Sequence, residues 1–141
     1  MRLLLLLVGA SLLSHDALAE GRFAVTPNPA WQAECASCHI AYPPQLLPAS
    51  SWRRLMSQLD RHFGTDASLD PVTVAEITQF LQSNAAFGKR SRGADGLRIT
   101  ETPWFVREHD EVGQKKLSAC ESCHTTAAQG DFRERNLRIG H

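Results

Sequence analysis

Apolar residues recur at helical spacing in four stretches of the chain, and each stretch opens with a residue that commonly caps helices. In three of the four, proline occupies the first helical position. The pattern predicts a short helix through Trp31 after Asn28-Pro29, a helix over 52–63 after Ser50-Ser51, a helix to about Ser83 after Asp70-Pro71, and a helix opened by Thr102-Pro103. No segment has a convincing strand pattern. We therefore expect a mostly α, small and loop-rich fold with few or no strands.

The first nineteen residues have the pattern of a secretory signal peptide. Arg2 gives a positive start, 3–13 is an almost unbroken apolar run, and Ala17-Leu18-Ala19 is a small-residue cleavage site. A membrane anchor is the rival interpretation, but eleven residues make a helix of roughly 16 Å, about half of a bilayer core. We expect cleavage before Glu20 and, because no later segment is long and apolar enough to span a membrane, an exported, soluble mature protein.

The charge balance excludes some partners. The 141 residues contain 15 basic and 15 acidic side chains, and removal of Arg2 and Asp16 with the signal peptide leaves 14 of each. A neutral chain is not typical of nucleic-acid binders or of basic membrane-surface proteins. Its length suits one compact domain or two small lobes that share a core.

All four cysteines fall into two copies of one motif, Cys-x-x-Cys-His, with no cysteine left over. The copies are Cys35, Cys38 and His39, and Cys120, Cys123 and His124. This motif is the attachment signal for c-type haem, because two thiols on one helical turn can bond both vinyl groups while the histidine lies beneath the iron. The alternatives are a redox pair, structural disulfides or a four-cysteine zinc site. A redox pair needs no histidine after its second cysteine, and a disulfide framework seldom repeats one motif. In a zinc site the two Cys-x-x-Cys pairs would be separated by 81 residues, which far exceeds the spacing of zinc ribbons.

The next question is what occupies the sixth coordination position of each iron. A ligand there sets the reduction potential, and an empty position leaves the iron open to external ligands. Met56 is the only methionine of the mature chain, so at most one haem can have a methionine ligand. Beyond the motif histidines, the mature chain has His62, His109 and His141. His62 lies at the edge of an apolar helix face and His109 lies in an apolar stripe between Phe105 and Val112, so both are ligand candidates. Met56 is favoured as a core residue and His141, at the terminus, is the weakest candidate.

A wider set of residues resembles the bacterial dihaem cytochrome c family, DHC. The resemblance covers nearly the whole mature chain. It rests on 35–39, Tyr42-Pro43-Pro44, Leu47-Pro48-Ala49, Ser51-Trp52, Met56, Leu59, His62-Phe63-Gly64, 67–70, Ile99-Thr100, Pro103-Trp104-Phe105 and Arg107-Glu108-His109. It implies a cytochrome c-type fold and a periplasmic electron carrier with two bis-histidine haems, in which His62 and His109 match the distal histidines. It also implies partners such as an oxygen-binding monohaem cytochrome c and a membrane cytochrome b.

The sequence therefore predicts a signal peptide over 1–19, a first haem lobe with class I cytochrome c-like helices over 20–83 and a second over 84–141. The second lobe begins with an exposed, basic, flexible connection to about Thr100. Chain proximity assigns His62 to the first haem and His109 to the second, and the crossed arrangement stays open. An enzyme or gas-binding protein with one five-coordinate iron is the alternative function. Candidate docking residues for an acidic partner are Lys89, Arg90, Arg92, Lys115 and Lys116.

Overall fold

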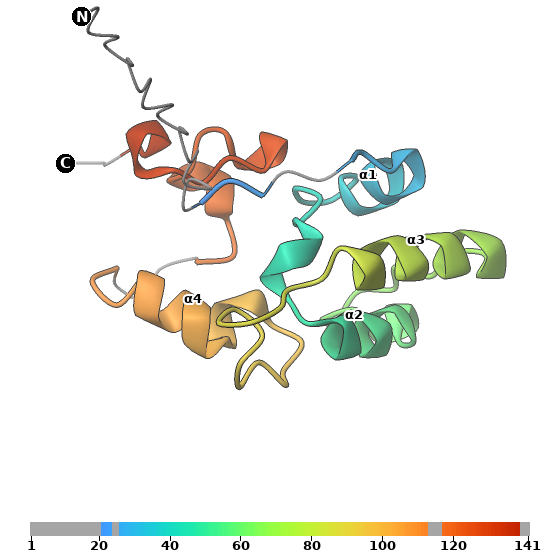
Figure 1. Ribbon diagram of the computed structural model, residues 1–141. Helices are drawn as coiled ribbons and strands as arrows, with labels where there is room; N and C mark the ends of the chain where they lie inside the picture. Colours follow the sequence, from blue (N-terminus) through green and yellow to red (C-terminus); the bar gives the residue numbers. More distant parts are fainter. Residues whose placement is uncertain (1–20, 24–25, 113–116, 139–141) are drawn as a thin grey trace, which may run out of the picture.

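The computed structural model describes residues 21–23, 26–112 and 117–138 (Figure 1). These residues form helices and short 3₁₀ turns joined by loops, and they contain isolated bridges but no extended strand. The helices are α1 (Pro29–Cys35), α2 (Ala49–Met56), α3 (Pro71–Ser83) and α4 (Pro103–Glu108), and the 3₁₀ turns are η1 (Pro44–Leu46), η2 (Leu59–Arg61), η3 (Ile99–Glu101), η4 (Cys120–Ser122), η5 (Ala127–Gln129) and η6 (Glu134–Asn136). The predicted mostly α, loop-rich fold is confirmed. In the described part of the chain, no helix has the length and apolar character needed to cross a membrane, and the predicted signal peptide lies outside it.

Helices α1 and α3 begin at the residues that the sequence predicts. Asn28 Oδ1 accepts the Trp31 backbone N–H at 2.7 Å, and Asp70 Oδ1 accepts the Val72 and Thr73 N–H groups at 3.0 and 3.1 Å. Proline follows each cap, where its missing N–H costs no hydrogen bond. These interactions span at most three residues, which explains why they could be read from the sequence.

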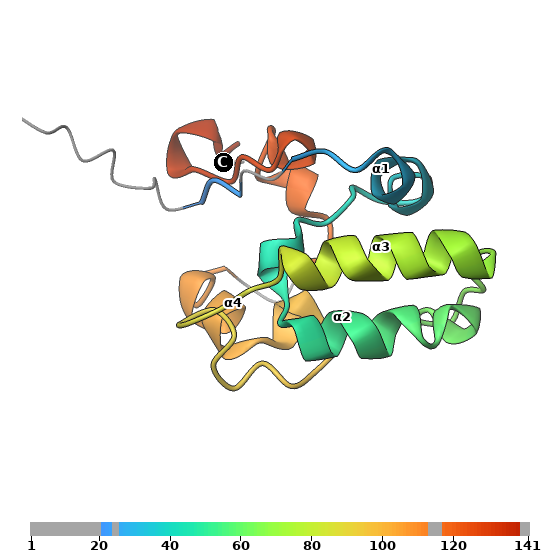
Figure 2. The ribbon, with the colours of Figure 1, turned by 45° about the vertical axis from the view of Figure 1, so that its right-hand side comes forward.

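The main hydrophobic core lies between α1, α2 and α3, which lie side by side in Figure 2. Its buried side chains are Trp31, Leu47, Trp52, Leu55, Met56, Ile77 and Leu81. Trp52 Nε1 donates to the Pro44 carbonyl at 2.7 Å, so the η1 turn is fixed against α2. Met56 is 6% exposed within this core, as its predicted packing role requires.

The second helix is shorter than the sequence predicts. It begins at Ala49, with Pro48 in the cap position and no side-chain capping bond, and it ends at Met56. The Ser57 hydroxyl donates to the Arg54 carbonyl at 2.8 Å, a local bond that competes with continued helix. The chain then enters η2, and His62 follows that turn instead of lying on a continuous helix.

Helix α4 also stops before the predicted stripe ends. Thr102 Oγ1 accepts the Phe105 N–H at 3.2 Å, so the predicted cap is confirmed. The helix ends at Glu108 because His109 Nδ1 donates to the Phe105 carbonyl at 2.9 Å, taking the acceptor that the next helical N–H would have used. Val112 therefore lies beyond the helix and is 47% exposed.

The connection over 84–100 is packed more closely than the exposed segment that its composition predicts. The Ala86 N–H donates to the Leu47 carbonyl at 2.9 Å, and Ala94 is buried. The Arg90 guanidinium carbon lies 4.8 Å from the ring centre of Phe23 and 5.4 Å from that of Trp104. Arg90 thus holds the connection against an aromatic cluster and is not one of the exposed basic residues.

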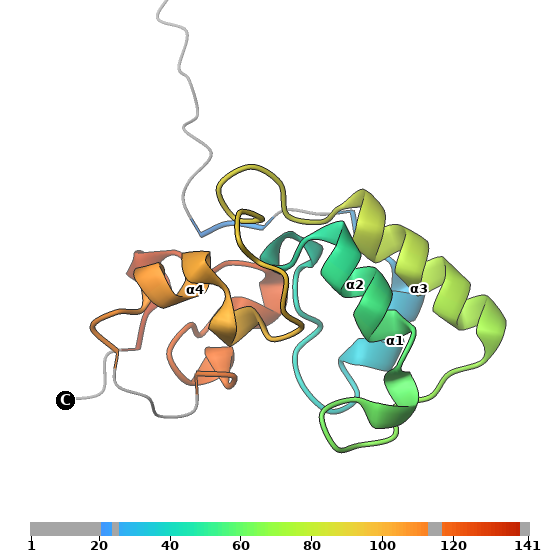
Figure 3. The ribbon, with the colours of Figure 1, turned by 90° about the horizontal axis from the view of Figure 1, so that it is seen from below.

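Residues 21–23 lie along the segment around Gly130, and in Figure 3 this blue stretch lies between α4 and the helices α1, α2 and α3. The Phe23 N–H donates to the Gly130 carbonyl at 2.8 Å, and the Phe132 N–H donates to the Gly21 carbonyl at 2.6 Å. Gly130 has φ +70°, and a Cβ there would lie 2.8 Å from the Phe23 carbonyl oxygen. Only glycine suits this close approach.

Candidate haem sites

The first motif begins at the end of α1. Cys35 is the last helical residue, and Cys38 and His39 lie exposed in the following turn. His39 Nδ1 lies 2.7 Å from the Ile40 carbonyl oxygen. Because a carbonyl only accepts hydrogen bonds, Nδ1 carries the hydrogen and Nε2 keeps the lone pair that a metal ion needs.

The structure brings His62 beside His39, although 22 residues separate them in the sequence. Their ring centres lie 6.1 Å apart, and the ring planes differ by 27°. Burial, followed by the nearby His39 ring, lowers the pKa of His62. His62 is therefore neutral at physiological pH, the form in which imidazole binds metals.

The second motif lies in η4 and the turn after it. His124 is partly buried with its ring against Phe132, at a centroid distance of 5.2 Å. Burial, followed by the His109 ring, lowers the pKa of His124, and the Phe132 backbone partly opposes this shift. The end of the described chain packs here, because the Arg138 N–H donates to the Cys123 carbonyl at 2.7 Å.

His109 lies beside His124, again with ring centres 6.1 Å apart but with planes that differ by 77°. Its Nδ1 bond to Phe105 leaves Nε2 as the metal-binding atom, as at His39. The Phe105 ring stacks on the imidazole at 3.9 Å. The contacts thus place His62 beside the first motif and His109 beside the second.

Both pairs have the separation that a metal ion between two imidazoles requires. A metal bonded to one nitrogen of each ring at about 2 Å puts the ring centres about 6 Å apart. Within the described residues no cluster of three or more histidine, cysteine or acidic side chains could hold a bare metal ion. A pair of axial ligands is what haem iron needs, because the porphyrin supplies the other four nitrogens. The residues present therefore fit haem.

The first cysteine of each motif lacks the lowered pKa that is typical of a redox pair. All four are free of disulfides. Burial raises the pKa of Cys35 to about 11, with a further contribution from Glu34, and burial and Glu121 raise that of Cys120 to about 11. Reactive Cys-x-x-Cys pairs have lowered pKa values. This favours haem attachment over the disulfide-exchange alternative.

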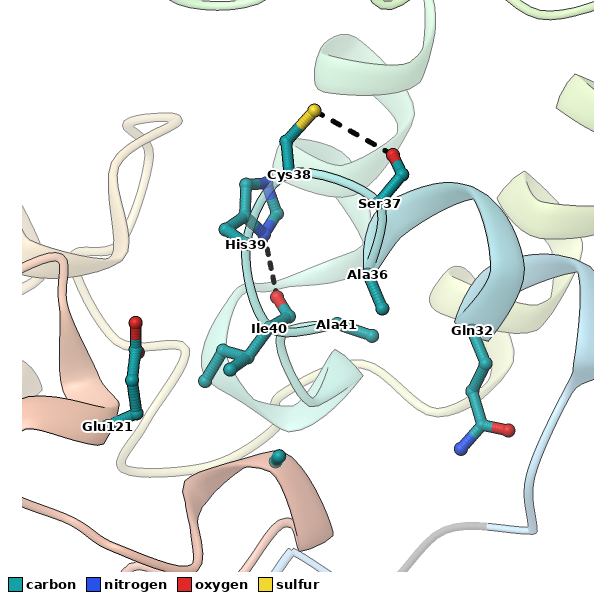
Figure 4. Close-up of a pocket in the computed structure, with 9 residues that line it drawn as sticks. Gln32, Ala36, Ser37, Cys38, His39, Ile40, Ala41 and Glu121 are labelled. Carbon is teal, nitrogen blue, oxygen red and sulfur yellow. Dashed lines mark hydrogen bonds between the residues drawn. The ribbon is translucent and has the colours of Figure 1, made fainter.

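A cavity of about 480 Å³ opens beside the first motif (Figure 4). Cys38 and His39 lie on one wall, and Glu121, from the second motif, lies opposite them. The two motifs, 81 residues apart in the sequence, therefore border one cavity.

Tyr42, which the sequence analysis names only as part of the Tyr42-Pro43-Pro44 run, is a contact residue of the first motif. Its ring stacks on His39 at a centroid distance of 4.8 Å, and its hydroxyl donates to the Ser118 carbonyl at 2.7 Å. Burial, followed by Cys120 and Glu121, raises the Tyr42 pKa to about 12. The stiff Tyr42-Pro43-Pro44 run was the available signal, but the contact spans 76 residues and no local pattern predicts it.

Three residues weighed from the sequence lie outside the described part of the chain: His141, Lys115 and Lys116. Of the other candidate docking residues, Lys89 and Arg92 are exposed, and Arg90 is half-buried.

Comparison with known proteins agrees with this geometry. The family model described as dihaem cytochrome c, DHC, matches residues 31–132. No curated protein matches the chain. Two solved structures of diheme cytochrome c from Rhodobacter sphaeroides are similar to it: one, purified DHC, at 46% identity over 77% of this chain and 100% of that chain with TM-score 0.67, the other at 42% over 77% and 98% with TM-score 0.69. A new diheme cytochrome type c from Shewanella baltica OS155 is similar at 38% identity over 82% and 94%, with TM-score 0.70. The chain therefore belongs to the dihaem cytochrome c family and carries two c-type haems.

Proposed function

We propose that the protein is a periplasmic electron carrier whose two haems each have two histidine ligands. The ligands are His39 and His62 at the first haem and His124 and His109 at the second, with covalent attachment through Cys35, Cys38, Cys120 and Cys123. The observation that carries the proposal is the pair of 6.1 Å imidazole separations, one at each motif. These histidines would then supply two strong ligands to each haem iron, which favours electron transfer over chemistry at an open iron.

When bound, each haem supplies a one-electron redox centre. The chain's own residues would attach it and ligate its iron. Ile40 and Phe105 supply the carbonyl oxygens that orient His39 and His109. Two histidine ligands give a lower potential than histidine with methionine, and Met56, buried in the core, leaves the histidine pairs as the ligands.

The proposal extends to location and partners. Residues 1–19 act as an export signal, and two haem lobes follow over 20–83 and 84–141, with residues 21–23 packed against the second. The family resemblance supports an oxygen-binding monohaem cytochrome c as acceptor and a membrane cytochrome b as donor. Their contacts with this protein are small, brief and steered by charge.

Absorption spectroscopy of the purified mature protein tests the ligation. We expect low-spin spectra in the oxidised and dithionite-reduced states, no shift on addition of carbon monoxide, and two haems per chain in a pyridine haemochrome assay. A high-spin component or rapid carbon monoxide binding in the unmodified protein would contradict the proposal and favour the enzyme or gas-binding alternative.

Single histidine variants then test each assignment. His62→Ala and His109→Ala should each open one iron, so that half of the haem becomes high-spin and binds carbon monoxide. His141→Ala is the matched control, because it removes the one remaining histidine of the mature chain, and its spectrum should be unchanged. A spectral change in the control, or none in the His62 and His109 variants, would show that the ligands are wrongly assigned.

A further inference from the structure

The residue after the proposed distal ligand of the first haem has an unfavourable backbone conformation. The Thr65 N–H donates to the His62 carbonyl at 3.0 Å and closes a turn whose two central residues have positive φ, +52° at Phe63 and +97° at Gly64. Glycine, asparagine and aspartate are the usual residues in such a turn, and a bulky aromatic residue there is strained. Backbone strain of this kind persists where contacts with the surrounding structure hold the residue in place, and it is concentrated at functional sites.

The side chain of Phe63 lies against the distal histidine. Its ring centre is 4.9 Å from that of His62, with the planes at 64° in an edge-to-face contact. On the Phe63 ring, the Arg98 guanidinium carbon lies 4.5 Å from the centroid, and Arg98 in turn pairs with Glu101 at 3.5 Å. The phenyl ring therefore lies between the imidazole and a cation from the connecting segment, although it is 48% exposed to solvent.

His62 depends on this contact more than His39 and His109 do. His39 and His109 each donate Nδ1–H to a backbone carbonyl, whereas the buried Nδ1 of His124 has no hydrogen-bond partner among the described residues and its ring is packed against Phe132. Among the described residues, no hydrogen bond reaches the His62 ring, and the aromatic rings that it contacts are those of His39 and Phe63. A cavity of about 100 Å³ also adjoins it, lined in part by Leu55, Gln58 and Leu97.

We propose that Phe63, held in place by Arg98, is the positioning residue of the distal histidine at the first haem. Its ring supplies the orientation that a hydrogen bond supplies at His39 and His109. The strained turn is the means by which the ring reaches this position. Without the ring, His62 leaves the iron more readily and an external ligand enters. This inference rests on the proposed ligation by His62.

The test is the rate at which carbon monoxide replaces a ligand in the reduced holoprotein, followed by stopped-flow absorption. Phe63→Ala should raise the rate for half of the haem by about threefold to tenfold, the range expected for loss of one edge-to-face contact. Phe63→Tyr keeps the ring and should match the unmodified protein. Arg98→Gln should give a smaller increase at the same haem. Phe87→Ala is the matched control, since it removes a phenyl ring that is 87% exposed, and it should change nothing.

Phe63→Gly separates the ring from the backbone. If the ring positions His62, the glycine and alanine variants exchange equally fast, even though glycine relieves the strain. If Phe63→Gly replaced its ligand by carbon monoxide at the rate of the unmodified protein, the effect would belong to the backbone and the proposal would be overturned. An unchanged rate of carbon monoxide replacement in Phe63→Ala would also overturn it. Failure of the proposed function differs from both outcomes, because the unmodified protein itself would then bind carbon monoxide rapidly or show high-spin haem.

Discussion

Removal of the Tyr42 hydroxyl tests whether one hydrogen bond holds the two haem motifs together. Tyr42 packs on His39 of the first motif and donates to Ser118, two residues before Cys120 of the second. With a pKa of about 12, the phenol keeps its proton at neutral pH and remains a donor. Tyr42→Phe retains the stacked ring and deletes only the bond between the motifs.

The expected cost follows from the environment of the acceptor. A neutral hydrogen bond contributes about 0.5–1.5 kcal/mol to the free energy of unfolding. Ser118 is exposed, so its carbonyl recovers a bond to water in the variant, and the cost should fall in the lower half of that range. For a chain of this size we expect the melting temperature to fall by about 1–4 °C.

The assay is denaturant unfolding of the holoprotein together with amide hydrogen exchange. In Tyr42→Phe, protection of the backbone amides against hydrogen exchange should fall locally at residues 118–124, because the hydrogen bond from Tyr42 to the Ser118 carbonyl is lost. Thr78→Val is the matched control: it removes a hydroxyl that donates to the Val74 carbonyl at 2.6 Å within α3, and it should leave residues 118–124 unchanged. A loss of global stability in Tyr42→Phe with unchanged exchange at residues 118–124 would refute the reasoning.

Two further predictions concern charge. Hydrogen bonds from Arg133 hold the pKa of Asp131 well below its usual range, so the stabilisation is present above the unfolded carboxyl value of about 3.9 and is lost as pH falls. In urea titrations, the unfolding free energies of Asp131→Asn and the unmodified protein should therefore differ at pH 7 and converge in acid. Replacing Lys89 and Arg92 together by glutamine should slow reduction of an acidic partner and flatten its salt dependence in stopped-flow assays, and an unchanged rate would remove both from the docking surface.

The parts of the fold that the sequence predicted are those fixed by neighbouring residues. Asn28, Asp70 and Thr102 cap their helices through bonds that span at most three positions. The helix ends were wrong where a side chain took a backbone acceptor that a periodicity argument assigns to the next N–H. Ser57 does so at the end of α2 and His109 at the end of α4. Sequence periodicity carries no information about such competition.

The connecting segment shows a second limit. Its glycines and basic residues indicate an exposed linker, yet Arg90 lies against Phe23 and Trp104, and Ala86 is paired with Leu47. Each contact joins positions well separated in the sequence, so composition could not reveal it. Arginine in particular is ambiguous, because its planar guanidinium suits both solvent and aromatic faces.

The candidate site contains both local contacts, which a sequence can indicate, and long-range contacts, which it cannot. Residue counts alone left three histidines for two irons, and the helical pattern narrowed them to His62 and His109. Which histidine lies beside which motif depends on how the helices pack, and the structure brings His62 beside His39 and His109 beside His124. The orienting contacts then divide by distance. Ile40, Phe63 and Tyr42 lie within three positions of the histidines that they contact, whereas the Tyr42 bond to Ser118 and the Arg98 contact with Phe63 act across the fold. A sequence can therefore indicate which histidines are candidate ligands. The long-range contacts that support them, from Tyr42 to Ser118 and from Arg98 to Phe63, become visible only in the structure.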